Sequence, residues 1–133
     1  MADADETVKQ THNATIVPHE TGDLTTSYVA KIVAEMHNCD TCSVYVYNED
    51  GSNAISWKLL GCNLKEPPAY GTTAGAWALL EDADGESEFI TDTESSTIKV
   101  FHVPCHKITL IAKGAGTITD KAHFDIMKTR RRG

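Results

Sequence analysis

Two segments with strong β-strand character lie only three residues apart in the C-terminal half of the chain. Residues 97–103 (Thr-Ile-Lys-Val-Phe-His-Val) and 107–113 (Lys-Ile-Thr-Leu-Ile-Ala-Lys) are rich in β-branched and aromatic side chains, which favour strands. A weaker segment of the same kind, 88–93, comes just before them. Parallel strands need a connection of a dozen residues or more, so links this short predict antiparallel hairpins.

Another pair of strands is expected earlier in the chain. Residues 42–48 (Cys-Ser-Val-Tyr-Val-Tyr-Asn) carry sizeable side chains on both faces, which is typical of a central strand. The turn 48–52 that follows contains Asp50-Gly51, a dipeptide that favours β-hairpins. We therefore expect residues 54–60 to return as the partner strand.

Three segments are expected to be helical. Candidate N-caps at 25–27 precede Val29, Ile32, Val33 and Met36, whose spacing of i, i+3, i+4 and i+7 matches one face of a helix. A second helix is expected over 74–82, after two threonines that can cap it. A third is expected to begin near residue 117 and to continue towards the C-terminus.

These elements predict an α+β fold, in which a five-stranded antiparallel sheet is flanked by helices. The expected order is helix, strand, strand, helix, three strands and helix. A chain of 133 residues fits one domain. Residues 1–23 are polar and have no periodic apolar pattern, so we expect a flexible N-terminal arm followed by a single domain over 24–133.

Charge and composition exclude several classes of function. The net charge is −7 and the isoelectric point is near 5.2, which argues against nucleic-acid binding because phosphate contacts need clustered Lys and Arg. No apolar run approaches the ~20 residues of a membrane span, and residues 1–6 lack the layout of a signal peptide. Four cysteines are few for a secreted scaffold, so we expect a cytoplasmic protein with free thiols.

The element order resembles that of the roadblock family of dynein light chains. The first hairpin, Val44-Tyr-Val-Tyr-Asn-Glu-Asp-Gly51, is similar to the hairpin of that family. The second helix with Trp77, followed by an acidic Asp-Gly turn, looks more like the small scaffold subunits of the Ragulator complex, called EGO in fungi. The resemblance covers residues 24–130.

This resemblance implies a roadblock/profilin-like scaffold or adaptor with no cofactor and no catalytic activity. It implies a homo- or heterodimer with a roadblock-type subunit, and binding to a small GTPase or its regulator. Contact with an endosomal, lysosomal or vacuolar membrane would come only through partners. Pairing through the second helix would use its small-residue face and its flank: Ala74, Gly75, Ala76, Trp77, Ala78, Leu80 and Glu81.

Two cysteine- and histidine-rich clusters support zinc binding as an alternative function. Zinc takes four nitrogen or sulfur ligands, and a Cys-x-x-Cys spacing lets one turn supply two of them. The second cluster lacks a clean Cys-x-x-Cys spacing, and a domain with this much apolar patterning does not need a metal to fold. We therefore assign no metal ligands, and the candidates are His37, Cys39, Cys42, His102, Cys105 and His106.

A small-ligand sensor of the GAF or PAS type is the other alternative. It would need a cavity over the sheet, and we expect Tyr45, Tyr47, Trp57 and Phe101 to fill that space. For enzymes, the sequence contains no Gly-x-Ser-x-Gly elbow and no His-Glu-x-x-His motif. The sequence therefore favours a non-enzymatic, protein-binding function.

Overall fold

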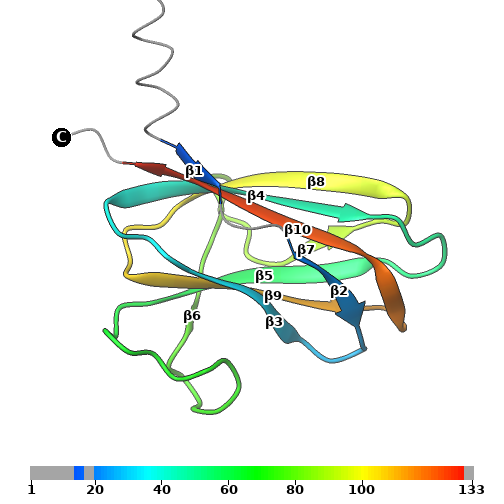
Figure 1. Cartoon of the computed structure of the whole chain (residues 1–133), viewed down its shortest axis with the longest axis horizontal. Coiled ribbons are helices and arrows are strands. Elements are labelled where there is room, and N and C mark those ends of the chain that lie inside the picture. Colours follow the sequence, from blue (N-terminus) through cyan, green and yellow to red (C-terminus); the bar gives the residue numbers. More distant parts are fainter. Residues whose placement is uncertain (1–13, 17–19, 131–133) are drawn as a thin grey trace, which may run out of the picture.

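The computed structural model describes residues 14–16 and 20–130, which form two antiparallel β-sheets packed face to face (Figure 1). Sheet A contains β1 (Ala14–Ile16), β2 (Glu20–Leu24), β4 (Cys39–Asn48), β8 (Ser95–His102) and β10 (Ile118–Arg130). Sheet B contains β3 (Val29–Glu35), β5 (Ile55–Cys62), β6 (Ala78–Leu79), β7 (Phe89–Thr91) and β9 (Lys107–Gly114). None of the described residues is helical.

The strand order is that of a jelly roll. β2, β10, β4 and β8 lie side by side in sheet A, and β3, β9, β5 and β7 lie side by side in sheet B. From β2 to β10 the chain changes sheets at the β2–β3, β3–β4, β4–β5, β7–β8, β8–β9 and β9–β10 links. Segments far apart in sequence are therefore neighbours in each sheet, as in other double-sheet jelly rolls.

The predicted α+β fold is wrong, and so is the roadblock resemblance that depended on it. The expected first helix is instead β3, in which Ile32 and Ala34 face the core, followed by buried Met36. Val29 and Val33, which completed the helical stripe, are exposed. The same segment satisfies a period of two as well as a helical period, and its β-branched residues lower helix propensity.

The other two predicted helices are also absent. Residues from 118 onward form β10, where Ile118, Ala122, Phe124 and Ile126 are buried on the inward face. The segment 74–82 is a series of turns that contains only the two-residue strand β6. Within this segment Gly75 adopts a φ value of +79°, a conformation incompatible with a continuous right-handed helix.

The strands expected over 42–48, 54–60, 88–93, 97–103 and 107–113 are confirmed, with shifted ends, as β4, β5, β7, β8 and β9. The predicted hairpins are wrong. The 49–54 link carries the chain from β4 in sheet A to β5 in sheet B, and the 103–106 link likewise joins β8 to β9 across the sandwich. Short links permit such crossings because two packed sheets are only ~10 Å apart.

The core lies between the sheets and is filled by large side chains. Trp57, Phe101 and Phe124 are fully buried, and Phe89 stacks on Trp57 with ring centroids 4.5 Å apart. Of the four side chains expected to fill a sensor cavity, Trp57 and Phe101 do lie in this core. Tyr45 and Tyr47 lie on the opposite face of sheet A and are half-buried.

The N-terminal residues expected to form an arm lie partly outside the described residues. In the part of this segment that the structure describes, β1 and β2 both pair antiparallel with β10. The boundary at residue 24 therefore falls at the end of β2. No helix among the described residues is long and apolar enough to cross a membrane.

Candidate functional sites: an apolar sheet face and a thiol-rich end

Sheet A presents an apolar surface on the side facing away from the core. The registers of β4, β8 and β10 place Ile98 beside Tyr45 and Asp125, and Val100 beside Ser43 and Met127. Directly opposite residues in antiparallel strands project to the same side, so these side chains form one continuous patch. We define this apolar patch as Tyr45, Tyr47, Ile98, Val100 and Met127.

The apolar patch is exposed and shallow. Ile98, Val100 and Met127 are 63%, 47% and 42% exposed. A depression of about 280 Å³ lies between β4 and β10 and is lined by Ser43, Tyr45, Asp125, Ile126 and Met127. Contiguous exposed apolar surface of this kind marks interaction sites more often than isolated exposed residues do. Its shallowness suits a protein surface better than a small ligand, which prefers an enclosed pocket.

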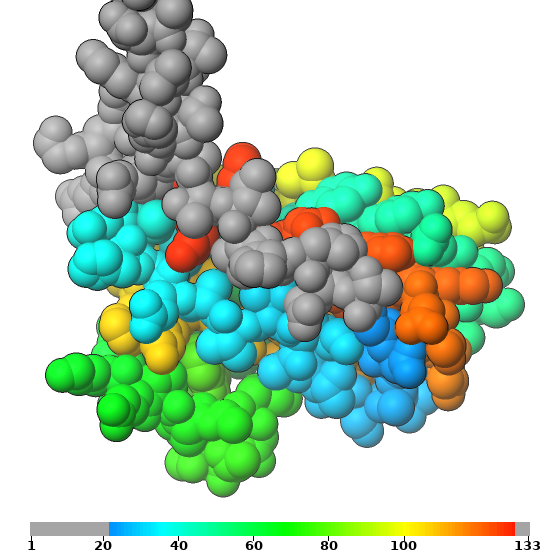
Figure 2. All heavy atoms as spheres, viewed as in Figure 1, coloured from blue at the N-terminus to red at the C-terminus, as the bar shows by residue number. Residues whose placement is uncertain are grey.

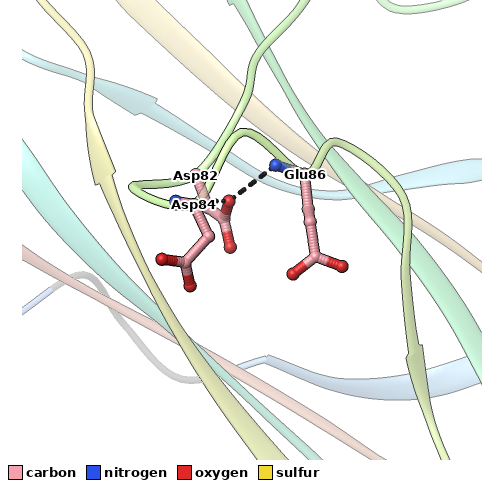
Figure 3. A group of neighbouring side chains, drawn as sticks. All are labelled: Asp82, Asp84 and Glu86. Atoms are coloured by element: carbon pink, nitrogen blue, oxygen red, sulfur yellow. Dashed lines mark hydrogen bonds between the residues drawn. The ribbon is translucent and has the colours of Figure 1, made fainter.

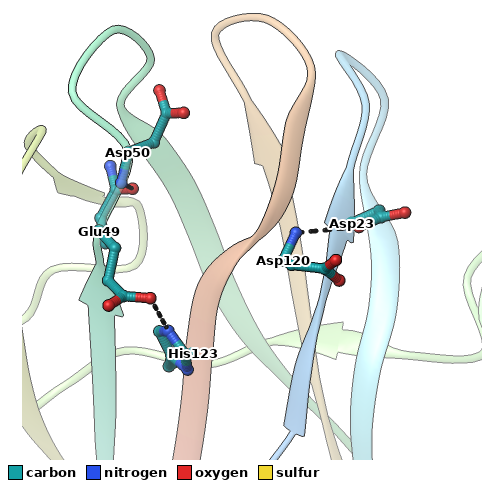
Figure 4. A network of polar contacts seen from close by, with 6 residues as sticks. Asp23, Glu49, Asp50, Asp120 and His123 are labelled. Atoms are coloured by element: carbon teal, nitrogen blue, oxygen red, sulfur yellow. Dashed lines mark hydrogen bonds and ion pairs between the residues drawn. The ribbon is translucent and has the colours of Figure 1, made fainter.

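Polar side chains border the apolar patch at one end. His123 Nε2 lies 2.6 Å from Glu49 Oε2, and the His123 ring stacks on Tyr47 with centroids 5.3 Å apart (Figure 4). Nearby, the Asp120 backbone amide donates a hydrogen bond of 3.0 Å to Asp23 Oδ1 and ties β10 to β2 (Figure 4). These contacts hold the border in place and give it a polar character, as in the rim of a protein–protein interface.

The edge of β8 is continuous with the apolar patch. Among the described strands β8 pairs only with β4. The Val100 carbonyl accepts a hydrogen bond of 3.0 Å from the Ala83 amide, which is not part of β4. In antiparallel strands alternate residues direct both backbone groups to the same side, so Ile98 also directs its amide and carbonyl away from β4. Ala83 therefore covers one part of this edge.

The two sequence clusters considered for zinc lie at one end of the sandwich. One belongs to the β3–β4 link and the start of β4, and the other to the β8–β9 link, at the left in Figure 1. The Met36 amide donates to the His106 carbonyl at 2.8 Å, and the Val103 amide donates to the Asp40 carbonyl at 2.7 Å. The topology therefore brings together two clusters that are about 60 residues apart.

All four cysteines lie at this thiol-rich end, and all are free thiols. Burial, together with the neighbouring Cys105 and Cys39 thiols, raises the pKa of Cys42 to about 12. Burial also raises the pKa of Cys105. Cys62, at the end of β5, was missing from the sequence candidates because no short spacing links it to another cysteine or histidine. His37 and His102 are exposed.

The residues expected to form a helical interface lie in the long excursion between β5 and β7. Ala74, Gly75, Ala78 and Glu81 are exposed, whereas Ala76, Trp77 and Leu80 are half-buried. Trp77 Nε1 donates a hydrogen bond of 2.9 Å to the Pro68 carbonyl. A depression of about 210 Å³ adjoins this turn and is lined by Tyr70, Gly71, Thr73, Ala74, Gly75 and Trp77. The helical face on which this prediction rested is absent.

Three carboxylates, of Asp82, Asp84 and Glu86, gather before β7 with oxygen atoms within 4.8 Å of one another (Figure 3). Asp82 Oδ1 accepts hydrogen bonds from the Asp84 and Glu86 amides at 3.0 and 2.8 Å. The Asp82 amide also donates to the Glu86 carbonyl at 2.7 Å. The side chain and the backbone of Asp82 therefore close this turn through hydrogen bonds.

No family model matches the sequence, and no curated protein does. Several solved structures are similar to this chain at low sequence identity. A subunit of Bacillus endospore appendages, which form disulfide-linked pili, is 16% identical, with 89% of this chain and 91% of that chain covered and a TM-score of 0.50. The prophage-derived protein YomS is 12% identical, with 86% of this chain and 96% of that chain covered and a TM-score of 0.48. The Yersinia pseudotuberculosis-derived mitogen is 10% identical, with 90% of this chain and 88% of that chain covered and a TM-score of 0.43. The likeness extends to the all-β fold alone, and none of these proteins is of the roadblock type.

Proposed function

We propose that this protein is a non-enzymatic interaction module that associates with a second copy of itself through the apolar patch of sheet A. The observation that supports this proposal is the exposure of Ile98, Val100 and Met127 on adjacent strands around Tyr45. Tyrosine and methionine are enriched at interfaces, and charged side chains are depleted in interface centres. Asp125 is the only acidic residue in the two central rows of this surface.

A second copy is the partner that best fits the charge of the chain. The net charge of −7 makes most pairs of surfaces on two copies repel each other. An apolar patch is complementary to itself, so two copies can join through the same surface in an isologous contact. Added salt should strengthen such a dimer, because it screens the repulsion between the two chains. The expected role with small GTPases depended on the roadblock resemblance and is not carried over.

The test is the solution mass of the full chain, measured by light scattering over a range of concentrations. We expect a dimer for the wild type and a monomer for Ile98→Glu and Met127→Glu. Val33→Glu is the matched control, since Val33 is 58% exposed on β3 of the other sheet. A monomeric wild type at every concentration and salt level would refute self-association, and an equal loss of mass in Val33→Glu would refute the position of the interface.

A further inference from the structure

The thiol-rich end combines soft ligand atoms that belong to three separate parts of the chain. Cys39 and Cys42 lie at the start of β4, Cys105 lies in the β8–β9 link, and Cys62 ends β5. In Figure 2 the cyan, gold and green atoms of the corresponding segments meet at the left of the molecule. Hydrogen bonds from Met36 to His106 and from Val103 to Asp40 hold the two crossing links together.

Three of these four thiols lie towards the space between the sheets. Cys42 is fully buried in the core, and Cys39 and Cys105 pack against the same core cluster. The Cys105 sulfur lies over the backbone of Gly61, where a Cβ atom would come within 3.0 Å of it. Alternation along β5 puts Cys62 on the opposite face from Trp57 and Leu59, and its sulfur accepts a hydrogen bond of 3.4 Å from the Leu64 amide.

We propose that Cys39, Cys42 and Cys105, with the adjacent half-buried His106 as fourth donor, bind a thiophilic d¹⁰ cation such as Zn²⁺. Sulfur and imidazole ligands are those such ions prefer, and Cys₃His is an established tetrahedral zinc set. In the metal-free structure the three sulfurs are too far apart to share one ion. Among the described residues, only the carboxylates of the acidic turn before β7 place three possible ligand atoms within 4.8 Å of one another. Binding therefore requires rotation of the thiol side chains towards one another.

The chemistry of binding is an exchange of protons for metal. Each S–H bond breaks as the sulfur–metal bond forms, and the proton passes to solvent, so no oxidant or reductant is needed. The buried, neutral thiol of Cys42 thereby becomes a thiolate whose charge the cation neutralises. The link between β8 and β9 would then be tied directly to β4, joining the two sheets at this end.

The test uses the full reduced chain titrated with Zn²⁺ and, separately, with Cu⁺, and is read by native mass and by metal content after gel filtration. Co²⁺ substitution adds a spectroscopic signature, since thiolate coordination produces an intense charge-transfer band. We expect one metal per chain. Cys39→Ser and Cys105→Ser should each weaken binding at least tenfold and diminish the band. Tighter retention of Cu⁺ than of Zn²⁺ would identify copper as the preferred d¹⁰ ion.

Cys62→Ser is the matched control. Cys62 belongs to the same end of the sandwich and its backbone lies next to Cys105, but its side chain points to the other face of β5. It should retain one metal per chain and the full charge-transfer band. Absence of bound metal in the reduced wild type would overturn the proposal. Equal weakening by Cys62→Ser, or metal loss in Asp84→Asn instead of the cysteine variants, would also overturn it. A mass loss corresponding to two hydrogens, with no metal uptake after reduction, would identify a disulfide pair instead.

Discussion

The two ends of this sandwich are stabilised in different ways. At one end Asn48 is fully buried, and its side-chain amide donates to the Asn53 and Asp92 carbonyls at 2.9 and 3.3 Å. Its oxygen accepts from the Asp50 amide at 2.9 Å. At the thiol-rich end the buried side chains include Met36, Cys42 and Val103, which pack with few polar contacts of their own.

This difference shows what each end can tolerate. Removing one partner of a buried hydrogen bond lowers the stability of the protein sharply, since the remaining group is left without a partner and without water. Sulfur atoms in an apolar setting behave as small hydrophobic groups, so their replacement costs less. The polar end therefore determines how the sheets are joined, whereas the thiol-rich end has freedom to acquire a binding role.

The largest expected effect is at Asn48. Asn48→Ala leaves two carbonyls and one amide without their partner, so we expect the free energy of unfolding to fall by about 3 kcal/mol. Urea denaturation followed by circular dichroism measures this loss. Asn63→Ala is the control at the opposite end: Asn63 is exposed and its Oδ1 accepts only the His106 amide at 2.9 Å, so a change below ~1 kcal/mol is expected. Similar losses in both variants would refute the contrast.

A smaller effect is expected at Thr91, whose hydroxyl connects the core to β8. Trp57 Nε1 donates to Thr91 Oγ1 at 3.1 Å, and Thr91 Oγ1 lies 2.9 Å from Thr97 Oγ1. Thr91→Val preserves the shape but removes the acceptor, leaving a buried indole N–H unpaired, so we expect a loss of about 1–2 kcal/mol. Thermal unfolding followed by tryptophan fluorescence measures it. An unchanged transition would mean that the indole finds another acceptor.

The smallest effect is expected at Asp50 and depends on pH. The Ser52 and Asn53 backbone amides hold the pKa of this carboxyl below its ordinary value. Because the folded-state pKa is lower than the unfolded one, the stabilisation is complete above the ordinary value near 3.8 and is lost as the pH falls through the folded pKa. Asp50→Asn should therefore flatten the decline in melting temperature between pH 5 and pH 2. A parallel decline in wild type and variant would contradict this assignment.

The strands were largely predictable, whereas the three predicted helices were wrong. β4, β5, β8 and β9 consist of dense runs of β-branched and aromatic residues, and such runs fit a half-buried pleated surface in almost any context. In β3, Ile32 and Val33 fit a helical face and a strand equally well, and only pairing with β9 decides between the two. The apolar patch was not predictable from 95–102. Ile98 and Val100 alternate with Lys99 and Phe101, and this pattern alone does not show which face is exposed.

The sequence by itself determined where the chain extends, where it turns and which cysteines and histidines lie close together along it. Only the tertiary structure decided which strands pair, because a link such as 49–54 can form a hairpin or cross between two sheets with similar local geometry. The choice depends on burying Trp57 and Phe101 between two layers, which is a property of the whole core. The same choice brings Cys105 to Cys42 and places Ile98 beside Tyr45, because long-range pairing of the strands, rather than spacing along the chain, sets both positions.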